Sequence, residues 1–130
     1  MDNDTPINNR FSGIAFVSCY VDDLEKAIDF YVNLLGFSKA FDMGENAVFL
    51  SVTEDLGLYL QGKCDLVSVG PNSVRSTFTF QVKSAGKLFE LLKSAGVETV
   101  ESSPMKMDDT NYWFQFRDPA GNFLEVLGQE

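Results

Sequence analysis

The chain has 130 residues, of which 45% are hydrophobic, and its formal net charge is −9 from 10 basic and 19 acidic side chains. This length and apolar content predict a single globular domain with a substantial core. The negative charge would repel a phosphate backbone, so we expect no nucleic-acid partner. No apolar run approaches a membrane span, and residues 1–10 lack a secretory signal pattern, so we expect a cytoplasmic protein with no membrane partner.

The sequence contains no histidine and two cysteines. Cys19 lies in an apolar strand pattern and Cys64 lies in a turn-like segment, and their spacing matches no zinc site. We expect both thiols to be reduced. The missing imidazole removes a common metal ligand and the usual base for a nucleophilic serine or cysteine.

Two segments of the chain are similar to each other. Residues 16–37 and 77–97 each read as a strand followed by a helix, and a glycine, Gly36 or Gly96, marks the expected end of each helix. This internal similarity predicts a duplicated structural unit.

Both helices have recognisable start signals and an apolar stripe. Asp22 and Glu25 predict a capping box for the first helix, and Ser84 is the expected N-cap of the second. The stripes that should face the core are Leu24, Ala27, Ile28, Tyr31, Leu34 and Leu35 in the first helix and Leu88, Phe89, Leu91 and Leu92 in the second.

Short strand patterns follow each helix, separated by turn residues. The expected strands are 37–43, 46–53, 56–62, 97–103, 111–117 and 122–127. The segments 43–46 and 118–122 contain glycine and are typical of hairpin turns. The order of elements predicts an α+β fold of two βαβββ modules.

We expect these modules to form one domain, residues 1–130. The first module should cover about 12–62 and the second about 74–128, with a linker at 63–73 and a mobile arm at 1–10.

Each strand carries a helix on one side only, so alternate residues divide into a helix-facing set and an opposite set. The helix-facing set is entirely apolar: Val17, Cys19, Val21, Val48, Leu50, Val52, Leu58, Leu60, Phe78, Phe80, Val82, Phe114, Phe116, Leu124 and Val126. The opposite set, which includes Ser51 and Gln81, mixes aromatic, hydroxyl and amide groups with one carboxylate. Its members that we predict to bind a ligand are Phe16, Ser18, Tyr20, Phe49, Tyr59, Gln61, Thr77, Thr79, Trp113, Gln115, Phe123 and Glu125.

The opposite set has an unusual composition for a sheet surface. A face exposed to water normally carries Lys, Glu and Arg, whereas a second core would carry Val, Leu and Ile. Aromatic walls with a few amides and hydroxyls are instead typical of a concave small-molecule site. The alternative is that these aromatic side chains pack against each other or against a partner subunit.

The paired strand-helix starts, the sequence DLEKAIDFYVNLLGF from Asp23 and the sequence RDPAGNFLEVLG from Arg117 resemble the glyoxalase/bleomycin resistance/dioxygenase superfamily, also called the vicinal oxygen chelate superfamily. The resemblance covers about residues 12–128. It implies that the two βαβββ modules build an open, cup-shaped mixed sheet and that the protein is a homodimer.

Metal-dependent members of this superfamily carry His, Glu or Gln ligands on the first and last strand of each module. The resemblance places these positions at Phe16, Tyr59, Thr77 and Glu125, with Gln61 on the same face as Tyr59. A phenyl ring has no donor atom, and a phenol or an aliphatic hydroxyl is a weak ligand beside imidazole or carboxylate. We therefore expect no divalent metal and no other cofactor.

These residues predict a metal-free small-molecule-binding protein, and the resemblance links it to sequestration of a cationic or aromatic antibiotic-like ligand. Trp113 and Tyr59 would stack on such a ligand, or Trp113 would close a dimer interface. Two alternatives are open. One is a glyoxalase-like lyase or isomerase with Glu125 as general base, with or without a metal, and the other is a subunit whose cup is filled by a partner segment. Alternatively, the Glu125 carboxylate only accepts hydrogen bonds from neighbouring Tyr20, Thr77 or Gln61 and has a structural role.

Overall fold

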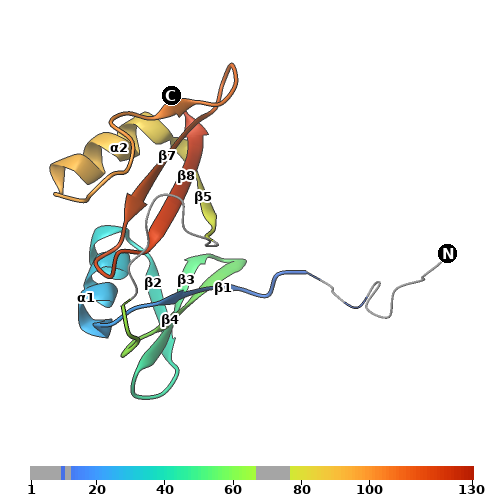
Figure 1. Ribbon diagram of the computed structural model, residues 1–130. Coiled ribbons are helices and arrows are strands. Elements are labelled where there is room, and N and C mark those ends of the chain that lie inside the picture. Colours follow the sequence, from blue (N-terminus) through green and yellow to red (C-terminus); the bar gives the residue numbers. More distant parts are fainter. Residues whose placement is uncertain (1–9, 11–12, 67–76) are drawn as a thin grey trace.

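The computed structural model describes residues 10, 13–66 and 77–130. Residues 1–9 of the expected arm and 67–73 of the expected linker lie outside the described residues. In Figure 1 the first module, coloured blue to green, occupies the lower half, and the second, coloured yellow to red, occupies the upper half. Among the described residues, no helix has both the length and the apolar character that a membrane crossing requires.

Each module contains one helical segment and four strands. The first consists of β1 (Val17–Tyr20), α1 (Leu24–Ile28), the π-helical continuation η1 (Asp29–Leu34), β2 (Ser38–Asp42), β3 (Ala47–Thr53) and β4 (Leu56–Gln61). The second consists of β5 (Thr79–Ser84), α2 (Ala85–Ser94), β6 (Met105–Lys106), β7 (Tyr112–Arg117) and β8 (Phe123–Gln129). The predicted pair of βαβββ modules is thereby confirmed.

The strands form two four-stranded sheets with the orders β1-β4-β3-β2 and β5-β8-β7-β6. In each sheet the first strand is an edge strand, parallel to its neighbour, and the other pairs are antiparallel. No strand pair joins the two sheets within the described ranges, so the expected mixed sheet is divided into two halves.

The helix starts differ slightly from expectation. Asp23, not Asp22, is the N-cap of α1, and its carboxylate accepts a hydrogen bond from the backbone N–H of Lys26 at 3.1 Å. The prediction for α2 is confirmed, because the Ser84 hydroxyl accepts from the backbone N–H of Lys87 at 3.0 Å. Both helices are therefore capped by a side chain of the type expected.

The predicted helix ends are confirmed. Gly36 and Gly96 have φ angles of 85° and 80°, in the left-handed region that favours glycine. The two predicted hairpin turns are also present, with backbone hydrogen bonds from Met43 to Ala47 and from Asp118 to Asn122 at their bases.

The apolar stripes are correct except at Leu34 and Leu91, whose side chains are 43% and 62% exposed. Phe30, which was not predicted, is buried instead. In η1 the backbone N–H of Leu35 bonds to the carbonyl of Phe30, and this wider turn changes the phase of the helical repeat. The buried line of α2 is Ala85, Phe89 and Leu92.

The strand predicted at 97–103 is reduced to one antiparallel bridge between Thr99 and Phe116, and the short strand β6 lies at Met105–Lys106. The backbone N–H of Val100 still donates to the carbonyl of Gln115 at 2.9 Å. The backbone N–H of Gln115, however, donates to the side-chain carboxylate of Glu101 at 2.6 Å. Because a side chain takes the place of the next backbone carbonyl, the ladder stops there.

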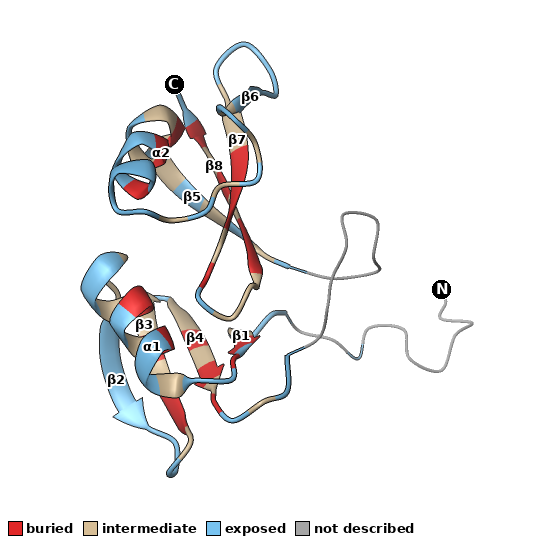
Figure 2. Ribbon diagram, turned by 60° about the vertical axis from the view of Figure 1, so that its left-hand side comes forward, coloured by how far each residue is buried: buried red, intermediate tan, exposed pale blue. Residues whose placement is uncertain are grey.

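One hydrophobic core runs through both modules. Every residue of the predicted helix-facing set is buried in this core or packed against it, and Figure 2 shows the buried positions along the strands and on α1 and α2. The modules meet through aromatic side chains: Phe30 packs against Phe116 at 6.2 Å between ring centroids, and Phe37 against Phe80 at 5.5 Å. The parity predicted from the sequence is therefore confirmed for the helix-facing side.

Candidate functional site

The helix-free face of the first sheet carries a cluster of four rings, Phe16, Phe41, Phe49 and Tyr59, which we call the aromatic platform. Phe41 stacks on Phe49 with ring centroids 5.3 Å apart and an interplanar angle of 9°. Phe16 meets Phe49 edge to face at 5.3 Å and lies 6.2 Å from Tyr59. Phe16 and Phe41 are 43% and 53% exposed, so the platform presents open ring surface.

Strand register and one glycine explain the platform. Phe49 lies opposite Tyr59 across the β3–β4 pair and opposite Phe41 across the β2–β3 pair, so all three side chains share one face. Gly57 is on the same face of β4, and a Cβ at that position would overlap the Phe49 ring. The missing side chain lets the ring lie close to the sheet.

The helix-free face of the second sheet carries a hydrogen-bonded group that we call the carboxylate trio: Thr79, Gln115 and Glu125. Glu125 of β8 lies directly between Thr79 of β5 and Gln115 of β7 in the two strand pairings. The Thr79 hydroxyl donates to Glu125 Oε1 at 2.8 Å, and Gln115 Nε2 donates to Glu125 Oε2 at 2.9 Å. Both carboxylate oxygens are thus held in position.

Two of the three partners that the sequence suggested for Glu125, Thr77 and Gln61, bond elsewhere. Tyr59 donates its hydroxyl hydrogen to Gln61 at 2.5 Å, and the Thr77 hydroxyl donates to the backbone carbonyl of Phe123. The polar neighbour proves to be Thr79, because the parallel β5–β8 register places Thr79, not Thr77, opposite Glu125.

An apolar row lies beside the trio. Trp113 of β7 is opposite Met105 of β6 and Leu127 of β8. Met105 is 53% exposed. Sequence reasoning missed Met105, Leu127 and, on the other sheet, Phe41. Leu127 could have been found, because it follows Glu125 at the period of two that defines the face.

Arg117 and Phe123 form the row on the other side of the trio. The guanidinium carbon of Arg117 lies 4.0 Å from the Phe123 ring centroid. Arg117 also forms an ion pair with Glu98 at 3.0 Å and donates to the carbonyl of Gly121 at 3.1 Å. It therefore stabilises the turn at 118–122.

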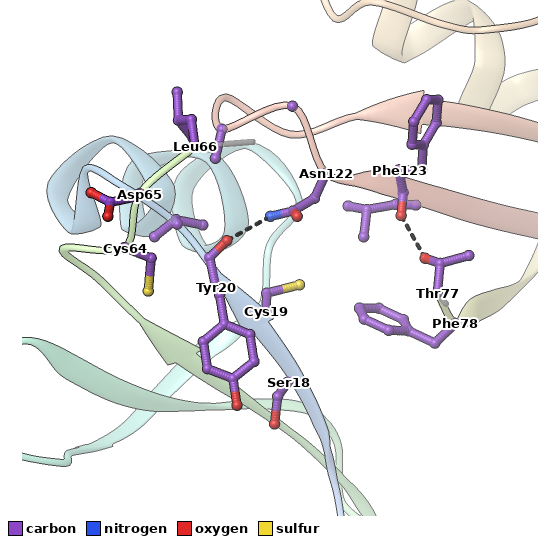
Figure 3. A pocket seen from close by; sticks show the side chains of 14 residues that line it. Ser18, Cys19, Tyr20, Cys64, Asp65, Leu66, Thr77, Phe78, Asn122 and Phe123 are labelled. Atoms are coloured by element: carbon purple, nitrogen blue, oxygen red, sulfur yellow. Dashed lines mark hydrogen bonds between the residues drawn. The ribbon is translucent and has the colours of Figure 1, made fainter. Parts of the chain in front are cut away.

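A cavity of about 390 Å³ lies where the edge strand β1 approaches the segments that lead into β5 and β8. Figure 3 shows Ser18 and Tyr20 on the first-module side and Thr77 and Phe123 on the second. These four residues all belong to the predicted binding set. The volume lies within the range of small-molecule pockets, roughly 300–1,000 Å³.

The structure therefore divides the predicted binding residues among neighbouring places. The platform contains Phe16, Phe49 and Tyr59, and Gln61 is hydrogen-bonded to Tyr59. The trio contains Thr79, Gln115 and Glu125, and Trp113 lies in the apolar row beside it. Ser18, Tyr20, Thr77 and Phe123 line the cavity. Within the part of the chain that the structure describes, no hydrogen bond or ring contact joins the platform to the trio.

The four positions at which related proteins hold a metal do not fit a divalent ion here. Phe16 offers no donor atom, Tyr59 and Thr77 offer only hydroxyl oxygens, which are weak ligands, and Glu125 supplies a single carboxylate. Elsewhere in the described ranges no group of three or more His, Cys, Asp or Glu side chains could hold a metal ion. The absence of a bound metal stays a prediction.

A buried polar cluster ties the two modules together on the helix-facing side. The Tyr31 hydroxyl donates to Asp118 Oδ2 at 2.8 Å and lies 3.4 Å from Cys19 Sγ. Asp118 Oδ1 accepts from the backbone N–H groups of Ala120 and Asn122. Burial raises the pKa of Cys19 to about 11 and also raises the pKa of Tyr31. Both groups are therefore protonated at neutral pH, and this cluster has a structural role.

Three solved structures illustrate the similarity of this chain to known proteins. An integron cassette protein from the mobile metagenome of the Halifax Harbour sewage outfall is 25% identical, with a TM-score of 0.67 over 91% of this chain and 99% of that one. The fosfomycin resistance protein FosX of Listeria monocytogenes is 20% identical, with a TM-score of 0.73 over 92% and 94%. The antibiotic binding protein TnmS3 of a Streptomyces species is 23% identical, with a TM-score of 0.69 over 92% and 98%.

A comparison with curated proteins gave no match. The family model described as Glyoxalase/Bleomycin resistance protein/Dioxygenase superfamily matches residues 13–126, which is nearly the whole of both modules. The chain belongs to the glyoxalase/bleomycin resistance protein/dioxygenase superfamily.

Proposed function

We propose that this chain is a metal-free small-molecule-binding protein that holds a flat aromatic ligand on the aromatic platform, beside the cavity between the modules. The observation that carries the proposal is the platform itself: stacked rings with open outer surfaces on a sheet face without a helix. A ligand ring placed there would replace water against Phe16 and Phe41, and aromatic pairs contribute roughly 0.5–1.5 kcal/mol each beyond the area they bury.

The platform and the cavity are adjacent through strand pairing. Ser18 lies opposite Tyr59, and Tyr20 lies opposite Gln61, in the parallel β1–β4 pair. Ser18 and Tyr20 also line the cavity. A ligand could therefore rest its ring on the platform and extend a substituent into the cavity.

The role that we propose for this binding is sequestration of an antibiotic-like compound. Two of the similar structures, TnmS3 and FosX, are described as antibiotic binding and as fosfomycin resistance proteins. At 23% and 20% identity they establish a shared fold, and they support the proposal only by showing that this fold occurs in proteins so described.

Direct binding measurements test the proposal. The chain has one tryptophan, so Trp113 fluorescence and thermal shift can follow a panel of planar aromatic antibiotics and dyes. We expect at least one compound to stabilise the wild-type protein and to lose at least about tenfold in affinity in Phe49→Leu. The control Leu91→Ala, which truncates an exposed side chain on α2, should bind normally. Equal affinity in Phe49→Leu and Leu91→Ala would contradict the platform as the site.

Two other expectations stay predictions. An enzyme that uses Glu125 as general base would show turnover that is abolished in Glu125→Gln while binding persists. A homodimer, implied by the family resemblance, would give twice the chain mass in sedimentation equilibrium.

A further inference from the structure

We infer that the ligand carries a cationic nitrogen group with several N–H donors, an ammonium or an amidinium, and that Glu125 and Gln115 recognise it. This inference rests on the proposed function and names the chemical class of its ligand. It starts from an unusual feature of the carboxylate trio, the side-chain amide of Gln115.

Gln115 is only 6% exposed, although its strand face carries no helix. A carboxylate accepts hydrogen bonds, so the amide must turn its NH₂ group toward Glu125 and its oxygen away. That oxygen has no hydrogen-bond partner among the described residues. A buried acceptor without a partner destabilises the folded protein, and native structures contain few of them. A donor from a ligand would remove this cost.

Glu125 also forms no ion pair with a cation in the described part of the chain. Its oxygens accept from the neutral groups of Thr79 and Gln115. The ion pairs of the described residues join Lys39 to Asp42 and Arg117 to Glu98, and none includes Glu125. Each carboxylate oxygen keeps acceptor capacity, because an ionised carboxylate has about four lone-pair sites in all.

A count of donors and acceptors shows which ligand group fits. The Thr79 hydroxyl hydrogen and one amide hydrogen of Gln115 are used within the trio. The spare positions are the remaining lone pairs of Glu125 and Thr79, the amide oxygen of Gln115, and only one amide hydrogen. The trio is therefore rich in acceptors and carries a negative charge. A cation with two or more N–H donors matches both properties, and the net charge of −9 favours its approach.

The neighbouring row supplies the apolar contact that such a ligand needs. Trp113, Met105 and Leu127 lie beside the trio on the same face. A cation is attracted to the face of a tryptophan, and a flexible methionine adapts to the carbon atoms that carry the cation, while the ring of the ligand lies on the platform. The inferred ligand class is thus an aromatic compound with an ammonium or amidinium substituent.

A matched series of naphthalene probes tests the inference. Naphthylmethylamine and naphthamidine are cations, naphthylmethanol is neutral and naphthoate is an anion, while the aromatic body stays constant. Calorimetry should show that the cations bind wild-type protein at least about tenfold more tightly than the neutral alcohol, with the anion weakest. The preference should decrease as salt is added, because partly exposed charges are screened.

Three variants identify the residues responsible. Glu125→Gln keeps the shape and removes the charge, so the preference for the cations should fall to less than about threefold. Gln115→Met removes the amide oxygen and should weaken cation binding several-fold. Gln81→Met is the matched control on the same face, since the Gln81 side chain is exposed and makes no hydrogen bond to another described residue, and its affinities should equal those of wild type. Circular dichroism and melting temperature check that each variant is folded, and Thr79→Val replaces Gln115→Met if the latter is not.

The outcomes separate this inference from the proposed function. Equal binding of cationic and neutral probes, or a preference that survives Glu125→Gln, would overturn the inference. If the neutral alcohol binds in a manner sensitive to Phe49→Leu while no cation preference appears, the proposed function stands and only the inference fails. Absence of binding by every probe and by the wider aromatic panel would overturn both.

Discussion

Removal of a single oxygen atom in Tyr31→Phe tests the tie between the modules. The Tyr31 hydroxyl is completely buried and donates to Asp118, whose side chain is 4% exposed. A hydrogen bond to a charged group contributes roughly 1.5–3 kcal/mol. Asp118 Oδ2 keeps a second donor, Asn122 Nδ2 at 2.9 Å, so we expect a loss of about 2 kcal/mol in the free energy of unfolding. For a chain of this size that corresponds to a fall of about 6–10 °C in melting temperature.

Urea denaturation followed by Trp113 fluorescence measures the change. Tyr112→Phe is the matched control, because it deletes the same atom from a partly buried tyrosine whose hydroxyl makes no hydrogen bond among the described residues. The control should change the free energy of unfolding by less than about 0.5 kcal/mol. A loss of the same small size in Tyr31→Phe would refute the idea that this bond holds the modules together.

Three further predictions concern a glycine and the two thiols. Gly57→Ala should displace the Phe49 ring, lower the affinity for aromatic probes measured by calorimetry, and reduce the free energy of unfolding by about 1–3 kcal/mol. Gly86→Ala is the control, because the nearest atom to a new Cβ is 3.6 Å away. Its calorimetric affinities should equal those of wild type. A disulfide reagent should label the partly exposed Cys64 quickly and the buried Cys19 only on unfolding, and equal rates would contradict the burial. Because burial raises the pKa of Cys19 from 9.0 to about 11, the stability that this thiol contributes is complete below pH 9.0 and is lost as the pH rises to about 11. The free energy of unfolding should therefore fall more steeply over this interval in wild type than in Cys19→Ala.

The division of the strands into two faces could be predicted from the sequence. Side chains alternate across a strand, so an apolar residue such as Val126 and a polar one such as Glu125 must point to opposite sides. This local rule requires no knowledge of which strands are neighbours. It therefore identified the helix-facing core correctly in both sheets.

The contacts across strands could not be predicted, because they depend on register. Thr77 and Thr79 both lie more than forty positions before Glu125, so the sequence does not show which of the two hydroxyls is its partner. Only the β5–β8 pairing selects Thr79. The division of the site between platform, trio and cavity similarly depends on how the sheets are placed, which alternation along one strand does not determine.

Two further errors arose where the chain departs from regular geometry. A repeat of 3.6 residues predicts that Leu34 faces the core, but the π-helical turn of η1 buries Phe30 instead. The missing strand at 97–103 has a different cause, since Glu101 satisfies a backbone N–H of β7 with its side chain. Neither feature leaves a clear pattern in hydrophobic periodicity.

The central claim is that an aromatic ligand binds this protein without a metal. The most direct measurement is calorimetric titration of the best aromatic probe into protein dialysed against a chelator, repeated after addition of Zn²⁺, Ni²⁺ or Mn²⁺, with wild type and Phe49→Leu side by side. We predict the same affinity with and without metal, and at least about a tenfold loss in Phe49→Leu. Binding that appears only after a metal is added, or that is unchanged in Phe49→Leu, would contradict the account.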